Sequence, residues 1–135
     1  MLDHHDVEEI VRSSLGPASG LFVSRSVETD GYLTLTIRAN SSTHTPNRTD
    51  GARAQIKTNG VDTFVLALDD QFEYRDVDWV PEGQRQILTL LTRLAEAYLA
   101  GSCRAEVKRG FFGGRYSELT VGLDRETYLF RGKRL

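Results

Sequence analysis

The feature that most constrains the fold is an apolar stripe in residues 81–101. Apolar side chains recur there at helical spacing, namely Ile87, Leu88, Leu91, Leu94, Ala95, Tyr98 and Leu99. Pro81 suits the first turn of a helix, and Gly101 suits its end. Because a helix with one apolar stripe has to bury it against another layer, the segment predicts a long helix packed on a sheet.

The sheet begins with a predicted hairpin in residues 21–39, where apolar and polar side chains alternate on both sides of the turn TDG. A two-residue turn would mix the polar and apolar faces of the two strands. A three-residue loop with Gly31 in the left-handed conformation instead pairs Val27 with Leu33. The resulting apolar face carries one charged residue, Arg25.

A second hairpin is predicted at Asn59-Gly60, because this dipeptide is typical of two-residue turns between strands. A loop of two residues places Lys57 opposite Asp62 and Ala54 opposite Val65.

Two further patterns complete the sheet. Residues 64–68 are apolar on both faces, which is typical of a central strand that is covered on both sides. Around GFFGGR, an odd-length loop puts the apolar residues of segments 103–107 and 119–123 on one face and Lys108 opposite Glu118.

The remaining segments fix the order of the elements. Residues 4–15 predict a short amphipathic helix with Asp3 as its N-cap, and residues 40–52 predict a polar loop. We therefore expect one α+β domain over residues 1–135, with a mostly antiparallel sheet of about seven to eight strands. The predicted order is helix, two strands, loop, three strands, long helix, three strands, with the long helix on one face of the sheet.

The amino-acid composition excludes few classes of function. The net charge of −2 gives no general attraction to nucleic acid or membrane, and no stretch has the length of a membrane span. The N-terminus lacks a basic region followed by an apolar run, so we expect a cytoplasmic protein. The single cysteine, Cys103, excludes an internal disulfide and any zinc site built on paired cysteines.

Seven residues between positions 68 and 80 are the main candidates for a functional surface. They combine carboxylates with aromatic rings, and they are Asp69, Asp70, Glu73, Tyr74, Asp76, Asp78 and Trp79. A calcium loop that starts at Asp76 fails, because its sixth position is Pro81 and its twelfth is Ile87. We therefore expect no metal and no cofactor.

Two interpretations of this segment stay open. In the first, the acidic residues are solvated turn residues, with Asp76 or Asp78 complementing the start of the following helix. In the second, the aromatic rings are anchors and the single-sign charge steers a basic protein partner toward the surface.

Arg25 and His44 carry an alternative. An arginine on an apolar face is paired with a carboxylate, lies at the margin of the sheet, or holds an anionic ligand. In the last case the protein would be a small domain that binds an anionic ligand, or an enzyme, with a pocket between the long helix and the sheet and the 40–52 loop that contains His44 as its lid.

Templates for catalysis and for nucleic-acid binding fit poorly. No serine or cysteine has the surroundings of a nucleophile, so no catalytic residue is assigned. The segment KRGFFGGRY alternates basic and aromatic residues, but two glycines at a hairpin tip explain it more simply than RNA binding. We expect a non-enzymatic protein-binding module for a basic partner, such as a bacterial immunity protein or a secretion chaperone.

Overall fold

The computed structural model describes residues 2–16, 20–39, 52–110 and 113–134. These residues form two helices, α1 (His4–Ser14) and α2 (Pro81–Leu99). The strands are β1 (Leu21–Val27), β2 (Leu33–Ala39), β3 (Arg53–Thr58), β4 (Thr63–Leu68), β5 (Phe72–Val77), β6 (Cys103–Arg109), β7 (Arg115–Leu123) and β8 (Glu126–Arg134). The predicted α+β class and order of elements are confirmed, while residues 40–51 of the predicted loop lie outside the described residues.

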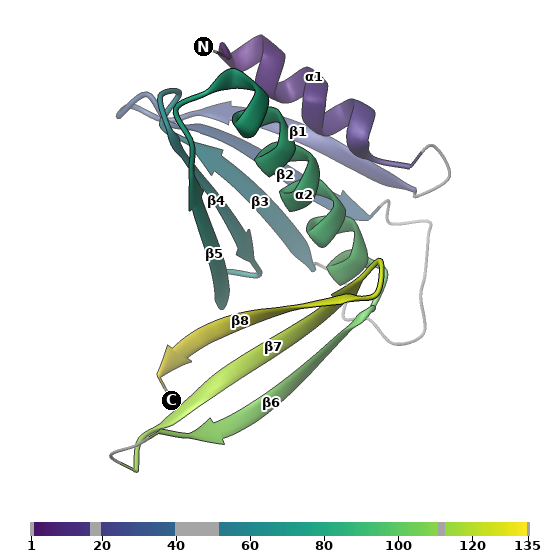
Figure 1. Cartoon of the computed structure of the whole chain (residues 1–135), viewed down its shortest axis with the longest axis vertical. Helices are drawn as coiled ribbons and strands as arrows, with labels where there is room; N and C mark the ends of the chain where they lie inside the picture. The colour runs from purple at the N-terminus through teal and green to yellow at the C-terminus, as the bar shows by residue number, and fades with distance from the viewer. Residues whose placement is uncertain (1, 17–19, 40–51, 111–112, 135) are drawn as a thin grey trace.

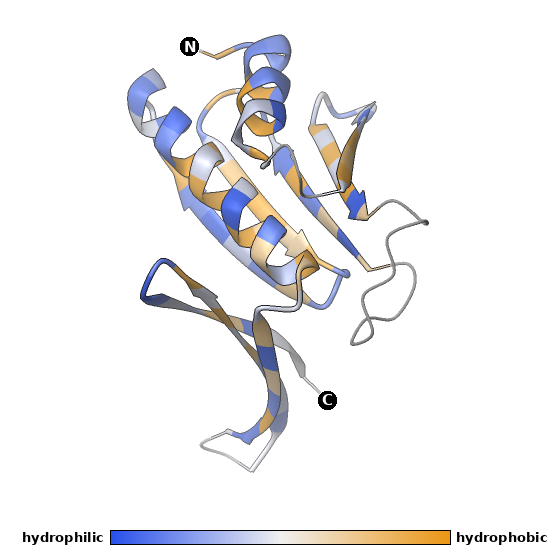
Figure 2. Ribbon diagram, turned by 90° about the vertical axis from the view of Figure 1, so that its right-hand side faces the viewer, coloured by the Kyte–Doolittle hydropathy of each residue, from blue (hydrophilic) through white to orange (hydrophobic). Residues whose placement is uncertain are grey.

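The strands form one antiparallel sheet in the order β1-β2-β3-β4-β5-β8-β7-β6. Both helices lie on the same face of this sheet, side by side, as Figure 1 shows. Apolar residues run along α2 and along the strands that it covers (Figure 2). The prediction that the long helix packs on one face of the sheet is confirmed.

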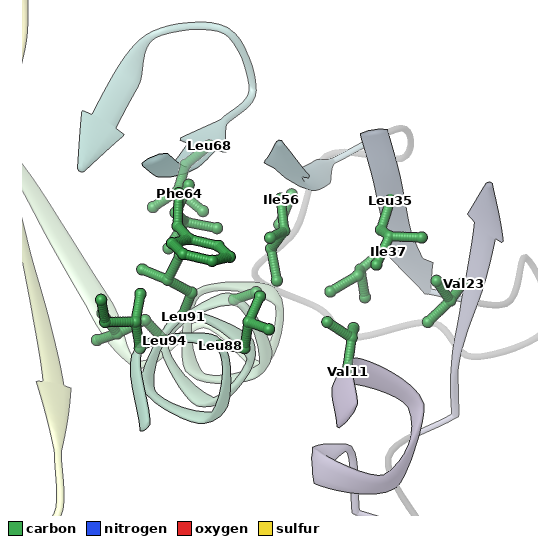
Figure 3. Close-up of a cluster of buried hydrophobic side chains, with 14 of the residues drawn as sticks. Val11, Val23, Leu35, Ile37, Ile56, Phe64, Leu68, Leu88, Leu91 and Leu94 are labelled. Atoms are coloured by element: carbon green, nitrogen blue, oxygen red, sulfur yellow. The ribbon is translucent and has the colours of Figure 1, made fainter. Parts of the chain in front are cut away.

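The core lies between α2 and the central strands. Leu88 and Leu91 are fully buried and point toward Ile56 and Phe64 (Figure 3). Each buried leucine contributes about 1.5–3 kcal/mol to folding relative to an exposed one. The two helices of the described residues are both too short or too polar to cross a membrane.

Local signals in the sequence define the ends of both helices. The Asp3 carboxylate accepts a hydrogen bond from the N–H of Asp6, and the Asp6 carboxylate accepts one from the N–H of Asp3, so the two close a capping box. At the end of α2, Gly101 has a φ of 87°, and the N–H of Ser102 donates to the carbonyl of Ala97 at 2.9 Å. This is a Schellman ending, for which glycine is preferred.

The first hairpin has the predicted register. Val27 lies opposite Leu33, and Gly31 has a φ of 87° in the loop. Matching the apolar faces of the two strands was therefore enough to set the length of this loop.

The second hairpin corrects the prediction. Lys57 lies opposite Val65 and not Asp62, and Ala54 lies opposite Leu68 and not Val65. The loop is therefore longer than the two residues that the Asn59-Gly60 signal suggested.

The side chain of Asn59 explains the longer loop. Its Oδ1 accepts hydrogen bonds from the three consecutive N–H groups of residues 61–63, at 2.9–3.1 Å. The wider loop also places Ile56 opposite Leu66, so that apolar residues of both strands face α2. A capping side chain together with face matching outweighs the preference for a two-residue turn.

The hairpin of β6 and β7 confirms the predicted face but not the exact register. Ala105 lies opposite Leu119, so the apolar residues share a face as predicted, but Lys108 lies opposite Tyr116 and not Glu118. The N–H of Gly110 donates to the carbonyl of Gly114, so β7 is shifted by two residues relative to the predicted pairing.

Strands β6, β7 and β8 form an arm that leaves the rest of the sheet at a narrow junction (Figure 1). Among the described residues the only register pair between β5 and β8 is Phe72 with Gly132. A Cβ atom at Gly132 would lie 2.9 Å from Cε1 of Phe72 and 2.9 Å from Cβ of Ser117. The junction therefore requires a residue without a side chain at this position.

We predict that Gly132→Ala lowers the free energy of unfolding by about 1–3 kcal/mol, because the added methyl group overpacks the junction. Urea denaturation measures this change. Gly122→Ala is the matched control in β7, since a Cβ atom there would meet nothing within 4 Å. Equal stability of the two variants would contradict the tight junction.

Candidate functional site

The structure divides the seven predicted residues among three places. Asp69 and Asp70 form the turn between β4 and β5, and Glu73, Tyr74 and Asp76 lie on β5. The last two, Asp78 and Trp79, lie in the connection from β5 to α2.

The two turn residues have structural roles. Asp69 and Asp70 have φ values of 52° and 56°, a left-handed conformation that aspartate tolerates better than most residues. Oδ1 of Asp69 accepts the N–H of Arg53 at 2.8 Å, and its Oδ2 accepts the hydroxyl of Tyr98. Asp70 pairs with the guanidinium of Arg53. This turn ties β3 and the end of α2 together.

Strand β5 presents its residues to opposite faces of the sheet. Tyr74 lies on the face of α2, where its ring centroid is 5.7 Å from that of Phe130. Glu73 lies on the other face, 3.4 Å from the guanidinium of Arg75. Asp76 shares the face of Tyr74, so the seven residues do not form a single surface.

Asp78 supports the start of α2. Its Oδ1 accepts the N–H of Val80 at 2.8 Å. The carboxylate also lies so close to Gly83 that a Cβ atom there would be 2.0 Å from Oδ2. A negative charge at this position complements the dipole of the helix. The interpretation that Asp78 complements the helix start therefore fits the structure.

Trp79 belongs to an exposed apolar surface that we call the Trp79 corner. It consists of Val61, Trp79 and Val80, whose exposed fractions are 41%, 71% and 60%. The N–H of Asp78 donates to the carbonyl of Asp62 at 3.0 Å, so the two segments that carry these residues are neighbours. Clustered apolar side chains on a surface are typical of contact sites for other proteins.

A buried glutamine holds the corner in place. Gln84 is only 1% exposed, and its Nε2 donates to the carbonyls of Val61 and Asp78, both at 2.8 Å. Because both segments are bonded to one side chain inside the molecule, the corner is preorganised. A preorganised surface loses less conformational entropy when it binds.

Carboxylates flank the corner. Asp76 comes directly before Val77, and Glu82 is exposed in the first turn of α2. Together with Asp78 they put three negative charges in residues 76–82, a segment without lysine or arginine. An apolar centre with charge of one sign around it is complementary to an apolar pocket with a basic rim.

A separate cleft lies between α2 and the β7–β8 turn. It has a volume of about 520 Å³, and its charged lining residues are Glu82, Arg85, Arg93, Asp124 and Glu126. Nη2 of Arg93 lies 2.7 Å from Oδ2 of Asp124. The lining therefore carries three carboxylates and two guanidinium groups.

Tyr128 also lines this cleft. Its hydroxyl donates to the carboxylate of Glu126 at 2.9 Å, and this bond raises the pKa of the tyrosine. The phenol therefore stays protonated at neutral pH and is a hydrogen-bond donor, not a base.

Arg25 lies away from this cleft. It is exposed on the edge strand β1, opposite Leu35, and no carboxylate of the described residues pairs with it. This is the predicted position at the margin of the sheet, where an inward-facing charge protects an edge. His44 lies outside the described residues.

A cluster of metal-binding side chains would be a second kind of candidate site. The ranges 2–16, 20–39, 52–110 and 113–134 contain no group of three or more His, Cys, Asp or Glu side chains arranged to hold a metal ion. The Trp79 corner is thus the surface with the clearest signature of binding.

Two residues of the corner were not predicted from the sequence. Val61 and Val80 are apolar, and apolar residues next to strands are normally buried. The one available signal was that Val80 falls outside the stripe of α2.

Comparisons with protein-family models, with curated proteins and with solved structures found no match.

We predict that Asp69→Asn destabilises the protein by about 1–2 kcal/mol, because asparagine cannot accept both hydrogen bonds. Asparagine tolerates the left-handed conformation, so the backbone itself is not strained. Asp70→Asn is the control, and its exposed ion pair contributes less than about 1 kcal/mol. Chemical denaturation of both variants measures the difference, and an inverted order would contradict the role of Asp69.

Proposed function

We propose that this chain is a non-enzymatic protein-binding module that docks a basic partner through the Trp79 corner. The single observation that carries the proposal is the exposure of Trp79, 71%, beside backbone segments that are bonded to the buried Gln84. Tryptophan is the residue most enriched in the energetic centres of protein interfaces. The backbone next to Trp79 is also anchored, because Gln84 donates to the carbonyl of the preceding residue, Asp78.

The charges next to the corner indicate the partner's chemistry. Asp76, Asp78 and Glu82 are complementary to lysine and arginine side chains around an apolar pocket. Asp69, Asp70 and Glu73 are excluded from this docking surface, because they lie at the other end of β5 or on the other face of the sheet.

Two kinds of small protein would use such a surface, an immunity protein that neutralises a nuclease-type toxin and a secretion chaperone. The purified complex distinguishes them. An immunity protein abolishes the enzymatic activity of its partner at one equivalent, whereas a chaperone holds its partner in an incompletely folded state.

We predict that Trp79→Ala weakens binding of the partner at least about 30-fold, which corresponds to about 2 kcal/mol. A photoreactive p-benzoylphenylalanine at position 79 first identifies the partner by crosslinking in the native host. Calorimetry with the purified partner then compares Trp79→Ala with Phe22→Ala. Phe22 is an aromatic residue that is 50% exposed on β1, far from the corner in the sheet order.

The same experiment decides against the proposal in two cases. One is crosslinking from position 22 but not from position 79. The other is equal loss of affinity in both alanine variants. Circular dichroism verifies that Trp79→Ala is folded, since an exposed side chain contributes within about 0.5 kcal/mol to stability.

We also predict that neutralising Asp76 and Glu82 together, as Asp76→Asn with Glu82→Gln, slows association and flattens its dependence on salt. The reason is that nearby charges of opposite sign accelerate encounter and are screened by ions. Asp70→Asn with Glu73→Gln removes the same number of charges elsewhere and is the matched control. Stopped-flow association rates at several salt concentrations provide the measurement, and identical slopes for both double variants would refute the steering role.

A further inference from the structure

The strand order of the sheet ends at β1 on one side and at β6 on the other, and these two terminal strands differ in how their backbone groups are occupied. In an antiparallel pair, alternate residues direct their N–H and C=O groups toward the neighbouring strand, and the residues between them direct theirs away. The free groups of each edge can therefore be assigned from the hydrogen bonds on its paired side.

On β1 the outward groups are partly covered. The N–H of Glu28 donates to the carbonyl of Tyr32, so even-numbered residues face β2 and odd-numbered ones face outward. The outward carbonyl of Val23 accepts Nη2 of Arg12 from α1 at 3.1 Å. Arg25 adds a charge on the inward face of the same strand, which discourages pairing with another strand.

On β6, the described residues provide no hydrogen-bond partner for most of the outward groups. The N–H of Gly122 donates to the carbonyl of Ser102, and the N–H of Gly110 donates to that of Gly114, so even-numbered residues face β7. Ala105, Val107 and Arg109 therefore direct their N–H and C=O groups away from the sheet. Figure 1 places β6 at the outer margin of the arm, with neither helix beside it.

The side chains of β6 are complementary to those of a second, antiparallel β6. Glu106 lies between Arg104 and Lys108 on one face, 2.9 Å and 3.0 Å from their nitrogen atoms. A two-fold axis at Val107 places Glu106 of each copy opposite Lys108 of the other, and opposite charges stabilise such cross-strand pairs. The same axis puts Val107, which is 61% exposed, against its own copy.

We propose that two copies of this chain associate through antiparallel pairing of their β6 strands, which joins the two sheets into one. The occupant of the open edge is thus a second copy and not an unrelated peptide, because the alternation of charge along β6 is complementary to itself. The contact is isologous, so it closes after two copies.

The decisive variant is Val107→Pro. Proline removes an N–H that points away from β7, so the pairing inside one copy is retained while pairing with a second copy is lost. Val27→Pro is the matched control, because it makes the same replacement at an outward position of the other edge. Sedimentation velocity across a range of concentrations is expected to show a dimer for the natural chain and for Val27→Pro, and a monomer for Val107→Pro.

Charge variants test the register. Glu106→Lys puts like charges opposite each other and is expected to weaken the dimer, whereas Glu106→Lys with Lys108→Glu restores opposite pairs and the dimer. Amide hydrogen exchange of the natural chain gives a readout that needs no variant. In the dimer, the amides of Ala105, Val107 and Arg109 become protected.

Three results would overturn the proposal. They are a natural chain that stays monomeric at all concentrations, a dimer that survives Val107→Pro, and fast exchange of the odd-numbered β6 amides in a dimeric sample. None of them bears on the Trp79 corner, which lies on a different part of the molecule.

Discussion

Burial of the α2 stripe is the interaction on which the rest of the structure depends. Leu88, Leu91 and Leu94 are completely buried. Helix α2, which carries them, contacts the central strands β3 and β4 and also strand β7 of the arm. To reach the helix layer, the chain leaves β5 and turns within residues 78–80, with Pro81 as the first helical residue. A connection this short leaves little room to bury its own side chains, so Trp79 and Val80 stay on the surface. The apolar corner is therefore a consequence of the helix packing. Gln84 bonds the two backbone segments that carry it, at the carbonyls of Val61 and Asp78.

The fold was predictable because the alternation of side chains constrains which residues share a face, and a shift by one residue would expose the core. Exact registers were less predictable. At the second hairpin, the Asn59-Gly60 signal suggested a two-residue loop, but Asn59 caps three amides and lengthens it. Ala54 then shares a face with Leu68 and not with Val65, so both the pairing and the predicted face were wrong there. At the third hairpin the pairing is shifted by two residues, and a shift of two keeps every side chain on its predicted face.

The acidic segment shows why closeness in sequence is a poor guide to a site. Two of its carboxylates stand in left-handed turn positions and bond to Arg53 and Tyr98, so their presence is explained by the turn. Alternation along β5 then separates Glu73 from Asp76. Only the part next to α2 lies beside exposed apolar residues. Its valines gave no signal in the sequence, since exposure depends on which segments meet in space and not on residue type.

The connection from β5 to α2, which carries Trp79, and strand β6 lie at opposite ends of the molecule (Figure 1), and this separation has a mechanistic consequence. A two-fold axis at Val107 would direct the two Trp79 corners away from each other, so that each stays accessible in the pair. Two identical partners, or two sites of one larger partner, would then bind with the avidity of a bivalent molecule. Pairing at β1 would be opposed by Arg12 and Arg25, which cover and charge that edge. If only β6 pairs with a second copy and β1 does not, association ends at a dimer and does not continue into a filament.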